Sequence, residues 1–330
     1  MANKIAVLGD GSWATAIVKI LMDNNHTIHW NIRLKDDIGY IKKYKRNPNY
    51  LHGVELHLDK ITLFHSIEET IKDCDIVIVV IPSAYLEIAL EGLPINSFQN
   101  KFIVSAVKGI VPDHYTTALE FIKNKYQLKD EQFGVISGPS HAEEIALQRL
   151  TYLTASAIQA DKALELSEMF KNSYVKTSVS DDIYGTEYAA IMKNIMAVAS
   201  GIAHGVGYGD NFQAVLISNS IREIKRFLDT AHPITRDIKN SVYLGDLLVT
   251  AYSTFSRNRT FGNMIGKGYS VKAAQMEMSM IAEGYYAVRG IYEMNKKFNI
   301  DLPITNAVYN ILYERISPKI EINLLTDLLD

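Results

Sequence analysis

Apolar and polar positions follow two different patterns along this chain. Up to about residue 180, short apolar runs alternate with segments whose apolar positions recur every three or four residues. The first pattern is typical of buried strands and the second of amphipathic helices. Runs that predict strands cover residues 5–8, 27–32, 61–64, 75–81, 102–106, 133–136, 151–157 and 174–178. Strands that alternate with helices predict a parallel sheet covered by helices.

After Ser180 the strand rhythm stops, and residues 181–330 read as helices joined by polar loops. A length of 330 residues suits two domains of ordinary size. We therefore predict an α/β domain at residues 1–180, followed by an all-helical domain at residues 181–330.

The most apolar of these helices opens the second domain and carries a single lysine. Between Tyr188 and Ala203 the only charged residue is Lys193, which shares one helix face with small residues four positions apart. A helix that is apolar nearly all round is normally buried, and a buried ammonium is costly without a partner or a task. We interpret Lys193 as functional, in preference to a lysine that extends to solvent from a core helix. The glycines that follow predict a loop that something approaches closely: Gly201, Gly205, Gly207 and Gly209.

The first strand run leads directly into Gly9-x-Gly11-x-x-Ala14, and a helical pattern begins there. Strand, glycine-rich turn and helix together form the dinucleotide-binding pattern, in which a helix N-terminus receives a pyrophosphate. The motif indicates a Rossmann-like, doubly wound first domain. Trp13 is bulky for a phosphate loop and is also consistent with a hydrophobic plug.

The second strand run ends near Arg33 without the acidic residue that usually binds a ribose hydroxyl there. An arginine at this place suits a 2′-phosphate, which favours NADP and the hypothesis that NADPH is used at least as well as NADH. Asp36 and Asp37 lie slightly later and keep NAD open.

The composition of the chain limits the partners and the cellular location that we expect. The formal net charge is −3, so nothing in the overall charge favours a nucleic-acid partner. Cys74 is the only cysteine, the N-terminus shows no signal peptide, and no uninterrupted apolar stretch is long enough to span a bilayer. We expect a soluble cytoplasmic protein, and no His, Cys or acidic cluster has the spacing of a metal site.

Three further polar positions have both a functional and a structural interpretation. Asp246 suits either an ion pair with Lys193 or the N-cap of a helix after Gly245. Arg257 begins a polar turn that suits a phosphate, although such a basic segment is more often a solvated turn. Ser140, with Glu143 three positions on, predicts a helix capping box.

Taken together, the motifs resemble those of bacterial NAD(P)-dependent glycerol-3-phosphate dehydrogenases over nearly the whole chain. The matching segments, in order, are Gly9–Trp13, Asn47–Leu51, Lys108-Gly109, Ser137–Glu144, Lys193-Asn194, Gly205–Asn211, Gly245–Leu247, Ser256–Gly262, Glu283-Gly284 and Leu302–Ile304. The chain departs from the family pattern at Asp10, Ala14 and His204.

The resemblance implies reduction of dihydroxyacetone phosphate to sn-glycerol 3-phosphate for phospholipid synthesis, with NAD or NADP as cofactor. It implies that Lys193 exchanges the proton, with Asp246 and Lys108 beside it. The substrate residues would be Lys108, Gly138, Ser140, Lys193, Asn194, Asp246, Ser256, Arg257 and Asn258. The cofactor residues would be Gly9, Gly11, Ser12, Trp13, Arg33, Lys108, Ala142, Arg257 and Glu283.

Two other functions remain open at this stage. One is a related two-domain dehydrogenase that acts on a 3-hydroxy acid or another carbonyl compound, and the other is a dinucleotide-binding sensor without turnover. Apolar stretches at residues 282–288 and 304–313 pack either within the second domain or across a two-fold interface. We expect a homodimer on this basis.

Overall fold

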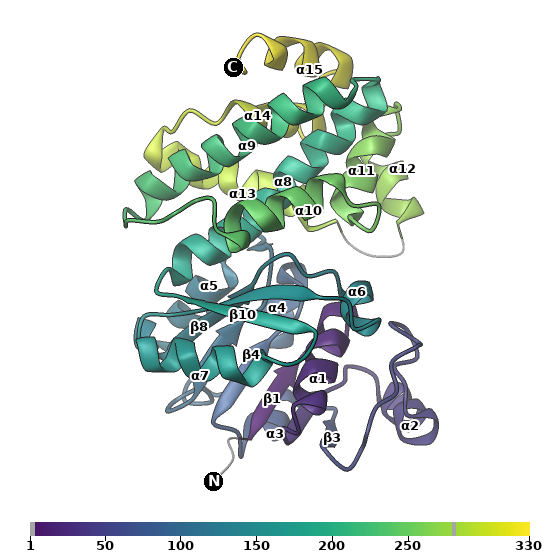
Figure 1. The fold of residues 1–330 in the computed structure, drawn as a ribbon, viewed down its shortest axis with the longest axis vertical. Coiled ribbons are helices and arrows are strands. Elements are labelled where there is room, and N and C mark those ends of the chain that lie inside the picture. Colours follow the sequence, from purple (N-terminus) through teal and green to yellow (C-terminus); the bar gives the residue numbers. More distant parts are fainter. Residues whose placement is uncertain (1–3, 279–281) are drawn as a thin grey trace. The chain divides into compact units, whose positions relative to one another are not determined.

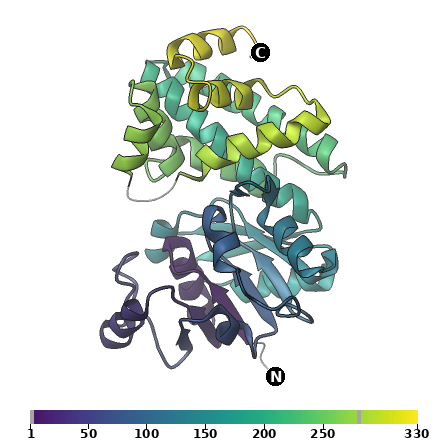
Figure 2. The ribbon, with the colours of Figure 1, turned by 180° about the vertical axis from the view of Figure 1, so that it is seen from behind.

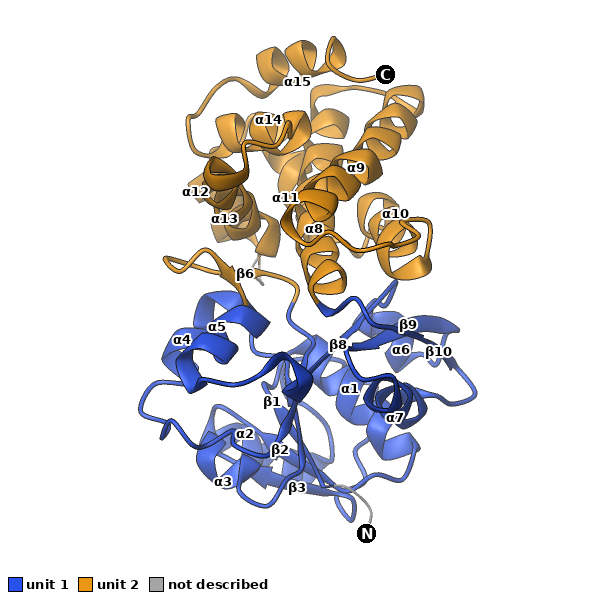
Figure 3. Cartoon of the chain, turned by 90° about the vertical axis from the view of Figure 1, so that its left-hand side faces the viewer, with its two compact units in different colours: residues 1–107, 118–183 blue, residues 108–117, 184–330 orange. Residues whose placement is uncertain are grey.

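The computed structural model describes residues 4–278 and 282–330, and these form two compact units. The first unit comprises Met1–Val107 and Ala118–Ile183, and the second comprises Lys108–Thr117 and Tyr184–Asp330. Figure 3 colours the two units separately. The division after Ile183 lies close to the expected boundary, but the segment Lys108–Thr117 belongs to the second unit although strands of the first unit precede and follow it.

The first unit is built on one eight-stranded sheet with the order β10-β9-β8-β5-β4-β1-β2-β3. All of its strand pairs are parallel except β8 with β9. Each predicted strand is present, and its ends lie within a few residues of the predicted ends. Their bounds are β1 Ile5–Leu8, β2 Ile28–Asn31, β3 Ile61–Phe64, β4 Ile76–Val79, β5 Phe102–Ser105, β8 Phe133–Ser137, β9 Thr151–Ala157 and β10 Val175–Ser180.

Helices cover both faces of this sheet, as the opposite views in Figures 1 and 2 show. The central strands β1 and β4 are buried along their whole length because both of their faces are covered. This arrangement confirms the Rossmann-like, doubly wound prediction. The helices are α1 Ser12–Asp23, α2 Lys35–Tyr44, α3 Ile67–Ile71, α4 Ser83–Ala89, α5 Ala118–Tyr126, η1 Asp130–Gln132, α6 Ala142–Ala146 and α7 Ala160–Phe170.

The second unit is helical, apart from a short hairpin that its first segment contributes. The hairpin pairs β6 (Ile110–Val111) with β7 (Thr116–Thr117). Ile110 is 1% exposed and joins the second unit's apolar core, where a Cβ added at Gly290 would lie 2.4 Å from its side chain. The helices are α8 Ile183–Val206, α9 Asp210–Ala231, the π-helix η2 Ser241–Gly245, α10 Asp246–Tyr252, α11 Arg257–Gly266, α12 Val271–Glu277, α13 Glu283–Phe298, α14 Pro303–Leu312 and α15 Pro318–Thr326.

The centre of the second unit is α8, which is buried on nearly all sides. Met192 and Met196 are fully buried and pack in the core, as the sequence predicts. Among the described residues, α8 alone is long and apolar enough by composition to cross a membrane, with a mean hydropathy of 1.2. However, 83% of that window is buried inside the protein, as in the core helix of a globular domain.

The backbone of α8 also lies directly against the backbone of α11. Gly201 and Gly205 on α8 face Gly262 and Gly266 on α11. A Cβ built on Gly201 would lie 2.1 Å from the Arg259 carbonyl oxygen, and one built on Gly262 would lie 2.1 Å from that of Val198. The expectation that Gly201 and Gly205 belong to a loop is therefore wrong, because α8 continues through both of them. The space beside these glycines is occupied by the backbone of α11, not by a ligand.

Two local predictions also differ from the structure. Ser140 does not cap a helix: α6 begins at Ala142 with His141 as its N-cap and no side-chain cap. Gly138, at φ +137°, turns the chain so that the Ser140 hydroxyl donates to the Gly138 carbonyl at 2.8 Å. Arg257 is not in a turn but opens α11, where the Ser256 hydroxyl accepts the Arg259 N–H.

We predict that Gly262→Ala lowers the free energy of unfolding of the second unit by roughly 1–3 kcal/mol, because the new methyl group forces two backbones apart. Gly39→Ala is the control, since Gly39 is also helical but has nothing within 4 Å of an added Cβ. It should be neutral or stabilising by up to about 1 kcal/mol. Thermal and urea unfolding measure both variants, and equal stability of Gly262→Ala and the natural chain would refute the tight crossing.

Candidate active site

Lys193 lies on α8 and is almost completely buried, with 5% of its surface exposed. Its Nζ forms an ion pair with Oδ1 of Asp246, the first residue of α10, which is 1% exposed. Asp246 therefore pairs with Lys193, as one interpretation predicted. The other interpretation, an N-cap, is wrong, because Gly245 is the N-cap of α10 and no side chain caps this helix. The ion pair explains how an ammonium is accommodated in an apolar helix bundle.

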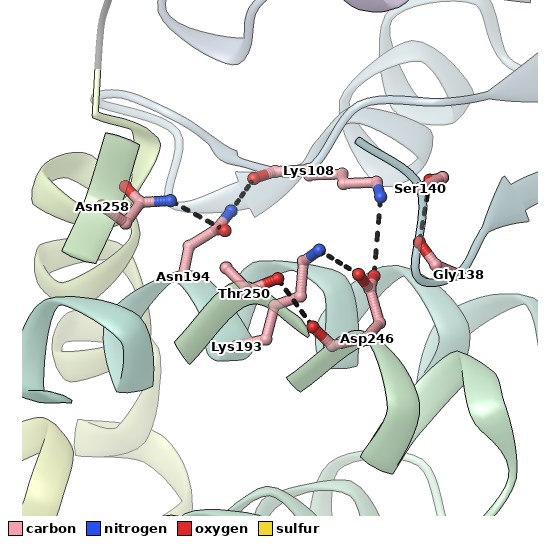
Figure 4. Close-up of polar contacts among 8 residues, drawn as sticks. All are labelled: Lys108, Gly138, Ser140, Lys193, Asn194, Asp246, Thr250 and Asn258. Carbon is pink, nitrogen blue, oxygen red and sulfur yellow. Dashed lines mark hydrogen bonds and ion pairs between the residues drawn. The ribbon is translucent and has the colours of Figure 1, made fainter. Parts of the chain in front are cut away.

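A second lysine shares the same carboxylate. The Nζ of Lys108, in the hairpin segment, lies 3.5 Å from Oδ2 of Asp246, and its side chain is 19% exposed. Figure 4 shows both ammonium groups directed at the one carboxylate. Two cations and one anion give this cluster a formal net charge of +1 when both lysines are protonated.

Burial lowers the pKa of Lys193 to about 7, because desolvation disfavours the charged ammonium. The Asp246 carboxylate raises this pKa, while the neighbouring Lys108 lowers it further. The desolvation effect outweighs the ion pair, so Lys193 exchanges its proton near neutral pH. A proton donor and acceptor is most effective when its pKa lies near the working pH.

A chain of hydrogen bonds beside the lysines ties four segments together. Asn194 Nδ2 donates to the Lys108 carbonyl at 2.7 Å, and Asn258 Nδ2 donates to Asn194 Oδ1 at 2.9 Å. Asn258 Oδ1 in turn accepts the Gly284 N–H at 2.9 Å. The hairpin segment, α8, α11 and α13 are thus held in register around Lys108, as the bonds drawn in Figure 4 partly show.

The other residues predicted in the second unit lie at helix starts. Ser256 is buried as the N-cap of α11, Arg257 is exposed in its first turn, and Glu283 is the first residue of α13. Arg257 therefore presents a guanidinium at a helix N-terminus, where backbone N–H groups also favour an anion. Gly284 was not predicted as a site residue, although it stands in the Glu283-Gly284 motif that carried the resemblance.

The glycine-rich turn of the first unit has the features that a pyrophosphate requires. Gly9, at φ +117°, approaches the backbone of Val80 so closely that an added Cβ would lie 3.1 Å away. Gly11 is the N-cap of α1, has no atom within 4 Å of an added Cβ, and provides no side-chain cap. The first turn of α1 starts at Ser12 and contains no acidic residue. The residues present therefore fit a bound dinucleotide phosphate.

The remaining predicted residues of the first unit are placed as follows. Trp13 is partly buried and packs against the core of its unit, in agreement with the plug interpretation. Ala142 is 7% exposed at the start of α6. Arg33 is exposed after β2, and Gly138 and Ser140 form the turn after β8.

The second strand ends without an acidic residue, as the sequence indicates, but a carboxylate from another segment lies at this strand end. Asp10 belongs to the glycine-rich turn, and its Oδ2 accepts the backbone N–H of Arg33 at 2.9 Å. The sequence marks Asp10 only as a departure from the small residue that the family usually has there. The contact of its side chain with the end of β2 is seen only in the structure.

Comparisons with known proteins cover nearly the whole length of the chain. The family model described as NAD-dependent glycerol-3-phosphate dehydrogenase N-terminus matches residues 4–163, and its C-terminal counterpart matches residues 182–323. Among curated relatives, glycerol-3-phosphate dehydrogenase [NAD(P)+] of Staphylococcus carnosus is 35% identical over 95% of both chains. That of Oceanobacillus iheyensis is 36% identical, over 96% of this chain and 92% of the relative.

Solved structures agree with this placement. The crystal structure of glycerol-3-phosphate dehydrogenase from Coxiella burnetii superposes with a TM-score of 0.90 at 25% identity, over 99% of both chains. A D-mandelate dehydrogenase superposes with a TM-score of only 0.60 at 15% identity, which shows a shared fold alone. The chain belongs to the NAD-dependent glycerol-3-phosphate dehydrogenase family.

Proposed function

We propose that this chain interconverts dihydroxyacetone phosphate and sn-glycerol 3-phosphate, with Lys193 as the residue that donates and accepts the proton. The chain is an oxidoreductase that depends on NAD or NADP. We propose that the glycerol 3-phosphate it forms supplies phospholipid synthesis. The observation that carries the proposal is the buried Lys193–Asp246–Lys108 cluster in a chain of this family.

A nicotinamide dinucleotide held at the glycine-rich turn by Gly9 and Gly11 would provide the hydride chemistry for the substrate C2 carbon. In the reduction, the protonated Lys193 gives a proton to the former ketone oxygen as negative charge develops there, and becomes neutral. In the oxidation, the neutral amine removes the hydroxyl proton. Asp246 holds the lysine in place in both directions, and Lys108 adds positive charge beside the oxygen.

The phosphate group of the substrate needs separate cationic or N–H donors. We assign this role to Arg257 and the first turn of α11, with Asn194 and Asn258 fixing the neighbouring segments. An arginine at this helix N-terminus would also suit the carboxylate of a hydroxy acid, so the choice of a phosphorylated substrate rests on the family match.

We also propose a cytoplasmic homodimer. The apolar positions within 282–288 and 304–313 are mostly buried in the second unit's own core, so they do not supply the interface. An exposed apolar stripe lies elsewhere: Ile320, Leu324 and Leu328 are 56%, 54% and 65% exposed at four-residue spacing. Antiparallel pairing of α15 with its copy would place Lys319 of one chain beside Asp327 of the other.

Replacing Lys193 tests the central assignment. We expect Lys193→Met to keep the fold and dinucleotide binding, because methionine suits the apolar helix. Its turnover with dihydroxyacetone phosphate and either NADH or NADPH should fall by about 10²–10⁴. Nicotinamide absorbance measures turnover, and a near-natural rate would show that Lys193 is structural.

The pKa of Lys193 predicts mirror-image pH profiles. Reduction needs the protonated lysine, so kcat should fall as the pH rises through about 7, whereas oxidation needs the neutral lysine and should rise through the same range. Asp246→Asn removes a group that raises this pKa and should move the midpoint to lower pH. Lys108→Met removes a group that lowers it and should move the midpoint to higher pH. Shifts in the same direction would contradict this electrostatic account.

Arg257→Ala tests whether Arg257 binds the phosphate group of the substrate. Loss of a charge-assisted hydrogen bond should lower kcat/KM for dihydroxyacetone phosphate by at least about tenfold. Unphosphorylated dihydroxyacetone has the same ketone without the phosphate, so the variant and the natural chain should be almost equally poor on it. An equal proportional loss on both substrates would assign Arg257 to the cofactor or to folding.

Light scattering at micromolar concentration tests the dimer. The natural chain should give twice the chain mass, and Leu324→Asp should give the monomer mass because a charge disrupts the apolar stripe. Leu164→Asp, at an exposed leucine on α7 (55% exposed), should leave the dimer intact. A monomeric natural chain would refute the homodimer, and a dimeric Leu324→Asp variant would refute this interface.

A further inference from the structure

Asp10 is the only acidic residue in the glycine-rich turn between Leu8 and Ala14, and one hydrogen bond orients its side chain. Its Oδ2 accepts the Arg33 backbone N–H at 2.9 Å, two residues beyond the end of β2. Its main-chain oxygen accepts a second hydrogen bond, from Asn47 Nδ2, at 2.9 Å. The carboxylate is therefore held at the carboxyl ends of the neighbouring strands β1 and β2.

The residue that holds Asp10 is itself rigid. Asn47 is 2% exposed, and its Nδ2 also donates to Thr15 Oγ1 at 2.8 Å. Its Oδ1 accepts the backbone N–H groups of Asn49 and Tyr50 at 2.9 and 3.1 Å. The Asn47 side chain cannot reorient without losing several of these bonds, so it fixes the main chain at Asp10, from which the carboxylate reaches Arg33.

The place where Asp10 stands has a defined chemistry in doubly wound folds. The end of the second strand is where the adenosine ribose of a dinucleotide lies, and a carboxylate there accepts a hydrogen bond from the ribose hydroxyl. The same carboxylate repels a 2′-phosphate, because two negative charges would approach each other. Oδ2 is engaged by Arg33, and within the described residues no donor is seen on Oδ1.

The competing group is the Arg33 guanidinium, which favours a 2′-phosphate. Arg33 is exposed, so its long side chain is solvated and any ion pair that it forms is screened. Asp36 and Asp37 are in the first turn of α2, where they stabilise that helix end. The Asp10 carboxylate is oriented by a hydrogen bond, whereas the Arg33 guanidinium is solvated. We therefore expect Asp10 to determine the selectivity between NADH and NADPH.

We propose that Asp10 makes the cofactor site selective for NADH over NADPH by accepting a ribose hydroxyl and repelling a 2′-phosphate. The inference rests on the proposed dinucleotide-dependent function and adds the selectivity. It replaces the hypothesis drawn from Arg33, which assumed that no acidic residue stood at this strand end.

Equilibrium binding tests the inference without turnover. Dissociation constants for NADH and NADPH are measured by nicotinamide fluorescence for the natural chain, Asp10→Asn and Arg33→Ala. Asparagine has nearly the shape of aspartate and still accepts the Arg33 N–H, but it carries no charge. The natural chain should bind NADH at least about tenfold more tightly than NADPH, and Asp10→Asn should reduce that ratio by at least about tenfold.

Arg33→Ala is the matched control, since it removes the other charged group at the same strand end. It should change the ratio by less than about threefold. An unchanged ratio in Asp10→Asn, an equal weakening of both dinucleotides, or tighter binding of NADPH by the natural chain would each overturn the inference while the proposed function stands. Failure of both dinucleotides to bind the natural chain would overturn the two together.

Discussion

The close approach of two helix backbones is the constraint on which the second unit depends. α8 and α11 meet through Gly201, Gly205, Gly262 and Gly266, where added Cβ atoms would collide with opposing backbone. Each glycine inside a helix costs roughly 0.5–1 kcal/mol relative to alanine, so four of them cost on the order of 2–4 kcal/mol. The chain tolerates this cost because no larger residue permits the crossing. The crossing also brings Asn258 of α11 to Asn194 of α8, and Asn194 adjoins Lys193.

The same arrangement explains why the pKa of Lys193 is lowered toward neutrality. Lys193 is removed from water by the apolar helices around it, and Asp246 compensates only part of that loss. With Lys108, the cluster of Lys193, Asp246 and Lys108 contains two cationic side chains and only one carboxylate. An anionic substrate would supply what is missing, so the cost of gathering two ammonium groups is offset only when the substrate is bound.

Much of this structure could be predicted from the sequence, because its strongest signals are local. The strand runs, the glycine turn before α1 and the apolar periodicity of α8 each depend on neighbours in the chain, and each was located correctly. The pairing of Lys193 with Asp246 was one of two open interpretations, since no local pattern distinguishes an ion pair from an N-cap. What the sequence did not show is non-local: the space at Gly201 is occupied by α11, and the side chain of Asp10, which follows β1, reaches the end of β2. Spacing along one segment carries no information about such partners.

The hairpin segment Lys108–Thr117 has a consequence for how this protein can be divided and recombined. Because it belongs to the second unit but is inserted in the first, the chain passes between the units at three peptide bonds: after Val107, after Thr117 and after Ile183. A fragment that begins at Tyr184 would lose Lys108 and leave an empty space beside Gly290, where Ile110 now packs. A chimera made by joining the first part of one relative to the last part of another would unite a hairpin and a helical bundle that have not evolved together. Exchange of the second unit as a functional module therefore requires the transfer of two separate gene segments.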